Sequence, residues 1–210
     1  MHNRCAVERG PEYRDAGFPK IYSQRVKSIN IKTKRDLSIS MLRANVLAFV
    51  IGIPVAIVQL TLFVILHGAL ELKVTSDGLP NVLLFFMILL VSIVVHEFIH
   101  GLTWKIVANK TSTTITYGVQ WKTLTPYAHV NEPLNVNVYR IGGFMPGFVL
   151  GIIPYLLSLL LGDTALLVFG IIHTFAAGGD WLILWLLRNL NRETLVQDHP
   201  SRAGCYVVGG

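Results

Sequence analysis

Two histidines and a glutamate, His96, Glu97 and His100, stand together in the second half of a long apolar segment. Residues four apart on a helix project from the same face, so both imidazoles can offer a ring nitrogen to one Zn²⁺. Glu97 lies beside them, where its carboxylate can take a proton from a water molecule at the metal. Residues 81–95 carry no charged side chain, so these polar groups lie where burying charge is costly. The pattern therefore favours a functional metal site over a polar cluster that only ties two helices together.

The composition points to a membrane protein. Of the 210 residues, 52% are hydrophobic and only 14% are charged, and the mean hydropathy is +0.54. The net charge of +6 could suggest a nucleic-acid partner, but the positive charges follow the pattern expected of membrane topology, so we expect none. The two cysteines, Cys5 and Cys205, lie near opposite termini and are expected to be cytosolic thiols rather than a disulfide.

Long apolar runs predict about four transmembrane helices. Each run is long enough to cross a hydrocarbon core of about 30 Å. The expected fold is an all-α membrane protein whose membrane domain covers residues 41–190 and lies in the lipid bilayer. The third run is interrupted by glycines and prolines and is a candidate for lining a path for water. The predicted spans are residues 41–68, 81–107, 141–161 and 165–190.

Three polar segments flank the spans. Residues 1–40 are basic and show no secretory signal pattern, and the residues around Leu37 are either a short strand or an interfacial segment. The loop 108–140 contains a β-rich, alternating stretch, which predicts a small hairpin with Gly118 at its turn. Residues 191–210 are expected to be a polar tail.

The distribution of Lys and Arg predicts the orientation. With four spans, 17 of the 18 Lys and Arg residues fall on the side of the N-terminus, and only Lys73 falls on the other side. The positive-inside rule therefore places both termini and the loop 108–140 in the cytosol, in a multi-pass protein of the cell membrane.

A catalytic zinc usually keeps three protein ligands and one open position, so a third ligand is needed. His96 and Asp180 each lie 15 residues from the outer end of their predicted helices, which is about 22 Å at 1.5 Å per residue. This match in depth favours Asp180, whereas His173 lies about 10 Å further out and is expected to be a helix-contact histidine. His129 could line the mouth of the site or lie on the surface. The candidates for the third ligand are Asp180, His173, His129 and Glu132.

These features together resemble the DUF3267 family of bacterial zincin peptidases, over residues 38–204. The resemblance implies zinc peptidase activity, by analogy with site-2 intramembrane proteases, which also pair this motif with a later aspartate. It implies that His96, His100 and Asp180 are the zinc ligands and that Glu97 is the catalytic base. The chain lacks the Asn-x-x-Pro and Asp-Gly arrangement of site-2 proteases, since Trp181 follows the aspartate. The resemblance is carried, besides the motif, by Tyr117-Gly118, residues 125–129, Glu132-Pro133-Leu134, Pro146, Gly178-Gly179-Asp180, Asp198-His199-Pro200 and Gly204-Cys205.

The resulting hypothesis is metal-assisted hydrolysis of peptide bonds in membrane-associated substrates near the cytosolic face. The substrate segment is expected to be a membrane protein or peptide, paired by strand addition to the hairpin at residues 111–120. One alternative is a non-catalytic membrane scaffold with a structural or vestigial zinc site. Another is a zinc transporter in which His96, His100, His173 and Asp180 mark the path, although no acid-rich or histidine-rich loop favours it.

Overall fold

The computed structural model describes residues 35–68, 78–109, 113–121 and 124–208, all within one unit of the chain, residues 31–210. Of the described residues, 66% are helical, and the strands form small antiparallel sheets. Four helical segments are long and apolar enough to cross a membrane, as predicted. They are Met41–His67, Pro80–Ala108, Val136–Leu161 and Thr164–Leu186.

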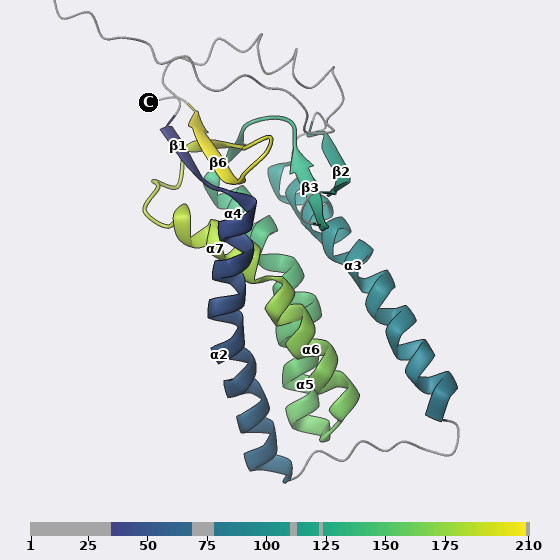
Figure 1. Ribbon diagram of the computed structural model, residues 1–210. Coiled ribbons are helices and arrows are strands. Elements are labelled where there is room, and N and C mark those ends of the chain that lie inside the picture. Colours follow the sequence, from purple (N-terminus) through teal and green to yellow (C-terminus); the bar gives the residue numbers. More distant parts are fainter. Residues whose placement is uncertain (1–34, 69–77, 110–112, 122–123, 209–210) are drawn as a thin grey trace, which may run out of the picture. The chain divides into compact units, whose positions relative to one another are not determined.

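The first two segments are single helices, α2 (Met41–His67) and α3 (Gly78–Ala108) (Figure 1). The side chain of Ser40 caps α2 by accepting a hydrogen bond from the backbone N–H of Arg43. α2 ends at Gly68, whose φ of 80° lies in the region that glycine tolerates best.

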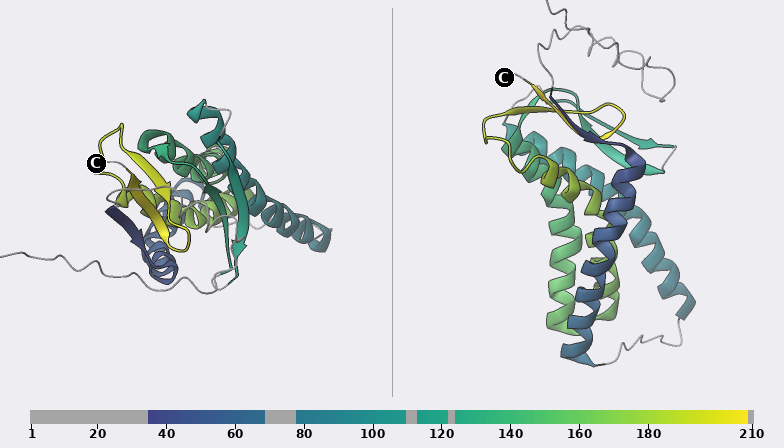
Figure 2. Two further views of the ribbon diagram at one scale, coloured as in Figure 1. Left: turned by 90° about the horizontal axis from the view of Figure 1, so that it is seen from above. Right: turned by 60° about the vertical axis from the view of Figure 1, so that its left-hand side comes forward.

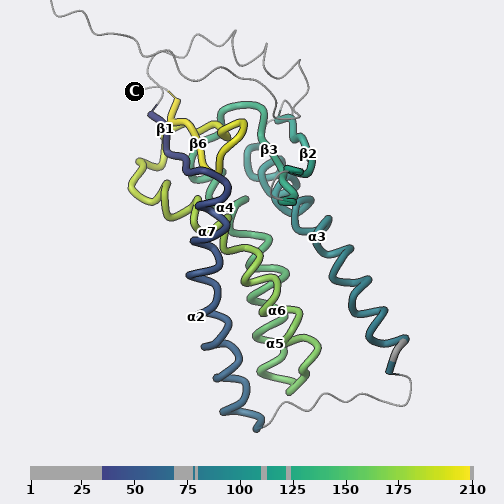
Figure 3. The backbone as a smooth tube through the Cα atoms, viewed as in Figure 1, coloured from purple at the N-terminus to yellow at the C-terminus, as the bar shows by residue number. Residues whose placement is uncertain are grey.

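The other two segments each consist of more than one helical element. The third consists of α4 (Val136–Pro146), the π-helical η1 (Gly147–Ile152) and α5 (Ile153–Leu161), which follow one another without a break in Figure 3. A proline lacks the N–H of a regular helix, and Pro154 stands just after η1. The fourth consists of α6 (Thr164–Ala176) and α7 (Gly178–Leu186). The third segment was predicted to start at residue 141, and it starts five residues earlier, at Val136.

Glycines bring these helices into close contact. A Cβ placed on Gly170 of α6 would lie 2.7 Å from the backbone nitrogen of Tyr155 in α5. A Cβ on Gly151 of η1 would lie 2.8 Å from the backbone nitrogen of Thr174 in α6. Both positions therefore need glycine for the helix backbones to approach as they do.

The strands form two sheets at one end of the helices (Figure 2). The hairpin of β2 (Ile115–Gln120) and β3 (Thr125–Val130) confirms the predicted hairpin, but Gly118 is not at its turn. Gly118 lies within β2 and pairs with Tyr127 in β3. Glycine is needed there because a Cβ would lie 2.5 Å from the Tyr127 hydroxyl oxygen. The larger sheet has the order β1-β6-β5-β4, all antiparallel, with β1 at Arg35–Ile39, β6 at Ala203–Val208, β5 at Leu195–Asp198 and β4 at Leu134–Asn135.

The four-stranded sheet corrects two expectations. The fold is not all-α, and residues 195–198 and 203–208 of the predicted tail are strands. Leu37 lies in the strand β1 and pairs with Cys205, which settles the choice between strand and interfacial segment. The rest of the basic segment, residues 1–34, lies outside the described residues, as does Cys5.

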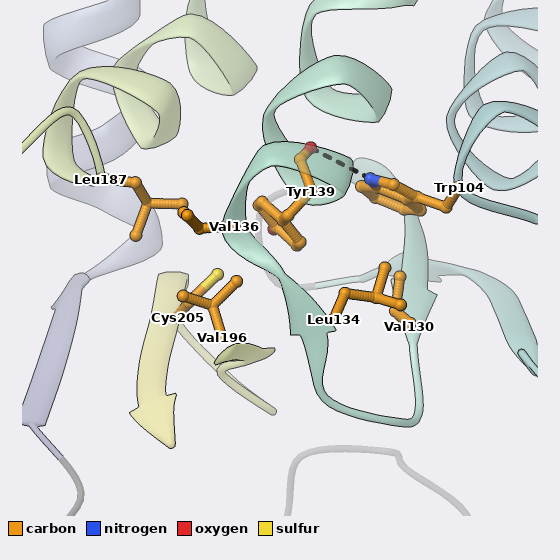
Figure 4. Close-up of a cluster of buried hydrophobic side chains, with 8 residues drawn as sticks. All are labelled: Trp104, Val130, Leu134, Val136, Tyr139, Leu187, Val196 and Cys205. Carbon is orange, nitrogen blue, oxygen red and sulfur yellow. Dashed lines mark hydrogen bonds between the residues drawn. The ribbon is translucent and has the colours of Figure 1, made fainter. Parts of the chain in front are cut away.

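A hydrophobic cluster joins this sheet to the ends of the helices (Figure 4). It contains residues of α3, α4, β3, β4, β5 and β6, so the strands and the last turns of α3 share one core. Trp104 and Tyr139 stack within it, with ring centroids 5.3 Å apart. The buried members are Trp104, Val130, Leu134, Val136, Tyr139, Leu187, Val196 and Cys205.

Candidate metal centre

His96, His100 and Asp180 converge at one point. Nε2 of His96 lies 3.1 Å from Oδ2 of Asp180, and Nε2 of His100 lies 3.3 Å from the same oxygen. Both imidazoles are buried, and the carboxylate is partly buried. One ligand atom from each residue lies within 4.8 Å of the other two, and among the described residues no other His, Cys, Asp or Glu cluster meets this condition. The predicted proximity of Asp180 to the histidine pair is therefore observed.

The break between α6 and α7 positions Asp180. Residues 165–190 were predicted to form one helix. In the structure α6 ends at Ala176 and α7 begins at Gly178, so Asp180 lies in the first turn of α7. Backbone N–H groups of a first helical turn carry partial positive charge, which stabilises a carboxylate there. A helix without this break would lack that stabilisation at Asp180.

His100 is oriented by α4. Its Nδ1 lies 2.9 Å from the carbonyl oxygen of Gly142, so the Nδ1–H donates there and Nε2 carries the lone pair that faces Asp180. Trp104 stacks on His100, with ring centroids 5.3 Å apart, and its indole N–H donates to the carbonyl oxygen of Tyr139 (Figure 4). A Cβ on Gly142 would collide with the Trp104 ring. Gly142 thus allows α4 to approach closely enough to orient His100.

Glu97 lies on the side of α3 that faces the β2–β3 hairpin. Its carboxylate accepts a hydrogen bond from the backbone of Ala128 in β3. Burial and the negative charge of Glu97 together raise the pKa of Tyr117 in β2. Gly101, one turn further along α3, makes room for the Tyr117 hydroxyl, since a Cβ there would collide with it. The hairpin therefore positions Glu97 beside His96, His100 and Asp180, the three residues of the candidate metal centre.

The other three candidates for the third ligand are not part of this cluster. Oε2 of Glu132 accepts a hydrogen bond of 2.8 Å from the backbone N–H of Thr114. His129 is buried, with Nδ1 3.5 Å from Oδ2 of Asp198, so of its two alternatives the surface position is wrong. His173 contacts a neighbouring helix, as expected, with Nε2 2.7 Å from the hydroxyl oxygen of Ser92 in α3.

The structure reveals a further residue that sequence reasoning left without a role, Asp198 at the end of β5. Its carboxylate accepts a hydrogen bond of 2.8 Å from the backbone N–H of Val130 and one of 2.5 Å from the hydroxyl of Tyr139. Burial and this carboxylate raise the pKa of the Cys205 thiol, whose sulfur lies 3.8 Å from Oδ1. Asp198 thus ties β5 to β3, the strand that contacts Glu97, and to α4, the helix that orients His100.

A family model described as "Putative zincin peptidase", DUF3267, matches residues 89–195, just over half of the chain. The chain belongs to the DUF3267 family. The matched region contains His96, Glu97, His100 and Asp180, together with the β2–β3 hairpin and α4. No curated protein and no solved structure matches the chain.

The donor atoms of this DUF3267 protein fit a zinc ion. Tetrahedral Zn²⁺ holds nitrogen and oxygen ligands at about 2.0–2.2 Å, so two of its ligand atoms lie roughly 3.3–3.5 Å apart. The two nitrogen-to-oxygen distances here are 3.1 and 3.3 Å. The hydrogen bond to Gly142 leaves Nε2 of His100 free to bind a metal. A set of two imidazoles and one carboxylate is also one that catalytic zinc uses.

Proposed function

We propose that this protein is a membrane-embedded zinc metallopeptidase that hydrolyses peptide bonds of membrane-associated substrates near the cytosolic face. The observation that carries the proposal is the convergence of His96, His100 and Asp180 on one point, with Glu97 beside them. Membership of a family described as zincin peptidases supports the same reaction class.

In this proposal His96, His100 and Asp180 hold Zn²⁺, which supplies Lewis acidity and lowers the pKa of water toward neutrality. Glu97 accepts a proton from the attacking water and returns it to the leaving amine nitrogen when the C–N bond breaks. The hydrogen bond from Ala128 holds the Glu97 carboxylate in place for both transfers. Nδ1 of His100 stays protonated against the Gly142 carbonyl, which keeps the ring orientation fixed.

The substrate is a membrane protein or peptide segment in extended form. Among the described strands, β2 has only β3 as a neighbour, so its other edge can accept a further strand. The hairpin also contacts α3 at Glu97, which would bring a paired segment near the catalytic carboxylate. Strand pairing suits a peptidase because it presents an extended backbone to the site.

The setting is the lipid bilayer of a bacterial cell membrane. The four apolar segments have the length and composition of membrane spans, and most of their large side chains are exposed, as lipid-facing residues would be. The excess of Lys and Arg on the side of the N-terminus supports a cytosolic position for both termini and the strands. Water would reach the site beside the interrupted third segment, whose small residues and π-helical turn break its regular packing.

The proposal is tested by replacing Glu97 with Gln in the purified protein, reconstituted in liposomes with zinc and a library of transmembrane peptides. Loss of a general base lowers the rate by about 10²–10⁴-fold, while zinc content stays at the wild-type level because the ligands are intact. The matched control is Glu132→Gln, which removes the same charge outside the site and leaves cleavage unchanged. Cleavage at the wild-type rate by Glu97→Gln would reject the assignment.

A further inference from the structure

A third buried imidazole lies next to the metal-binding group. The ring of His173 in α6 lies 6.3 Å from the ring of His96 between centroids, and the two planes differ by only 22°. His173 is 3% exposed and His96 is 7% exposed. In both residues Nδ1 is buried without a hydrogen-bond partner among the described residues. A buried polar atom left unpaired costs about 1–3 kcal/mol, so two of them on adjacent rings indicate a shared role.

The tautomer of His173 follows from its contact with Ser92. The Ser92 hydroxyl has one hydrogen, and it donates this to the carbonyl oxygen of Leu89 at 2.7 Å. The same hydroxyl oxygen lies 2.7 Å from Nε2 of His173, so it must accept the hydrogen of that nitrogen. Nδ1 of His173 therefore carries a lone pair. Phe169 packs against the ring at 4.5 Å between centroids and restricts its movement.

The tautomer of His96 is the complementary one. Its Nε2 faces Asp180 and must be unprotonated to bind a metal, so its Nδ1 carries the hydrogen. Nδ1 of His96 is thus a donor and Nδ1 of His173 an acceptor, on rings whose centroids lie 6.3 Å apart. One water molecule between the rings would accept from the first nitrogen and donate to the second, in hydrogen bonds of about 2.8 Å.

We propose that His173, oriented by Ser92, is a positioning residue that holds His96 through this water in the tautomer and orientation needed to bind the metal. The Gly142 carbonyl holds His100 in the same way, so each histidine ligand has its own outer partner. This inference rests on the proposed metal site and adds two residues to it, both in segments that could span the membrane.

The test measures Co²⁺ and Zn²⁺ affinity of the full-length protein in detergent, by competition with a chromophoric chelator, beside thermal unfolding of the metal-free form. His173→Phe keeps a ring of similar size but removes both nitrogens, and we expect metal binding to weaken about 10–100-fold. The metal-free protein should lose little stability, because the lost hydrogen bond to Ser92 is offset by the removal of a buried unpaired nitrogen. His173→Asn restores most of the affinity, since its amide oxygen lies near the place of Nδ1 and can accept the same hydrogen bond.

Two further variants separate the possible outcomes. Ser92→Ala frees the His173 ring to change tautomer and weakens metal binding less than His173→Phe; it carries the test if the Phe variant does not fold. The matched control, His67→Phe, removes an exposed histidine whose Nε2 contacts the carbonyl oxygen of Leu159, and it leaves affinity unchanged. Wild-type affinity in both His173→Phe and Ser92→Ala, or lower stability with unchanged affinity, would overturn this inference alone. Absence of metal binding by the wild type would overturn the proposed function itself.

Discussion

Asp180 and Asp198 are carboxylates in two different regions. A histidine ring nitrogen lies near each of them, but the donors of their other hydrogen bonds differ in kind. Asp198, in the strand region, accepts hydrogen bonds from a backbone N–H and a tyrosine hydroxyl, groups that carry a hydrogen at any physiological pH. Asp180, among the helices, faces ring nitrogens of His96 and His100. In the neutral ring, His100 donates its Nδ1–H to Gly142 and presents a lone pair on Nε2 to Asp180.

The difference teaches how to separate a structural carboxylate from a functional one. Two acceptors that face each other repel unless a proton or a metal cation lies between them. Asp198 needs no such partner, since its donors satisfy it within the protein. Removing Asp198 should therefore affect mainly stability, and removing Asp180 should affect mainly metal binding.

Asp198→Ala should have the largest effect on stability. The change leaves the Val130 N–H and the Tyr139 hydroxyl buried without their acceptor, and we expect a loss of about 3 kcal/mol in the free energy of unfolding. The measurement is denaturant unfolding in detergent, beside zinc stoichiometry of the folded fraction. Stability equal to the wild type would remove the structural role that distinguishes Asp198 from Asp180.

Gly142→Ala should affect both properties. The added Cβ collides with the Trp104 ring and pushes α4 from α3, at a cost of about 2 kcal/mol. It also lengthens the hydrogen bond from His100 to the Gly142 carbonyl, so zinc affinity should fall about tenfold. The control is Gly179→Ala, where a Cβ meets nothing within 4 Å. If both variants behave alike, close approach of α4 does not orient His100.

Tyr139→Phe should have the smallest effect. It removes one hydrogen bond to Asp198 but keeps the ring that stacks on Trp104, so we expect a loss of about 1 kcal/mol in unfolding free energy. Zinc affinity, measured by competition with a chelator, should not change, because Trp104 donates to the backbone oxygen of residue 139, which the variant retains. A marked loss of affinity would show that the Asp198 network reaches the metal site through this hydroxyl.

The helices and the metal-binding group could be predicted because their signals are local or repeated. Predominantly apolar stretches of about 20 residues or more identify the spans, and the spacing of His96 and His100 places them on one helix face. Depth along the two predicted helices favoured Asp180, and the structure brings Asp180 close to both histidines. The break before α7 was not predicted, because the apolar run at residues 165–190 was taken for a single helix.

The four-stranded sheet could not be predicted from local pattern, because its strands pair with partners far along the chain. β6 pairs with β1, and β5 pairs with the two-residue strand β4, which is too short to give a signal. The apolar pairs Leu195-Val196 and Val207-Val208, on either side of a polar turn containing Pro200, are a weak hairpin signal that was passed over. His129 was taken for a possible surface residue for the same reason, since its partner Asp198 lies in that sheet.

The central claim is that His96, His100 and Asp180 bind one zinc ion, and metal analysis of the purified protein tests it most directly. We expect about one zinc per chain in the wild type and almost none in Asp180→Ala, because two imidazoles alone hold zinc weakly. Asp163→Ala, which removes a helix-capping carboxylate outside the site, should keep the zinc. Equal zinc content in the wild type and Asp180→Ala, or no zinc in a folded wild type supplied with it, would contradict the claim.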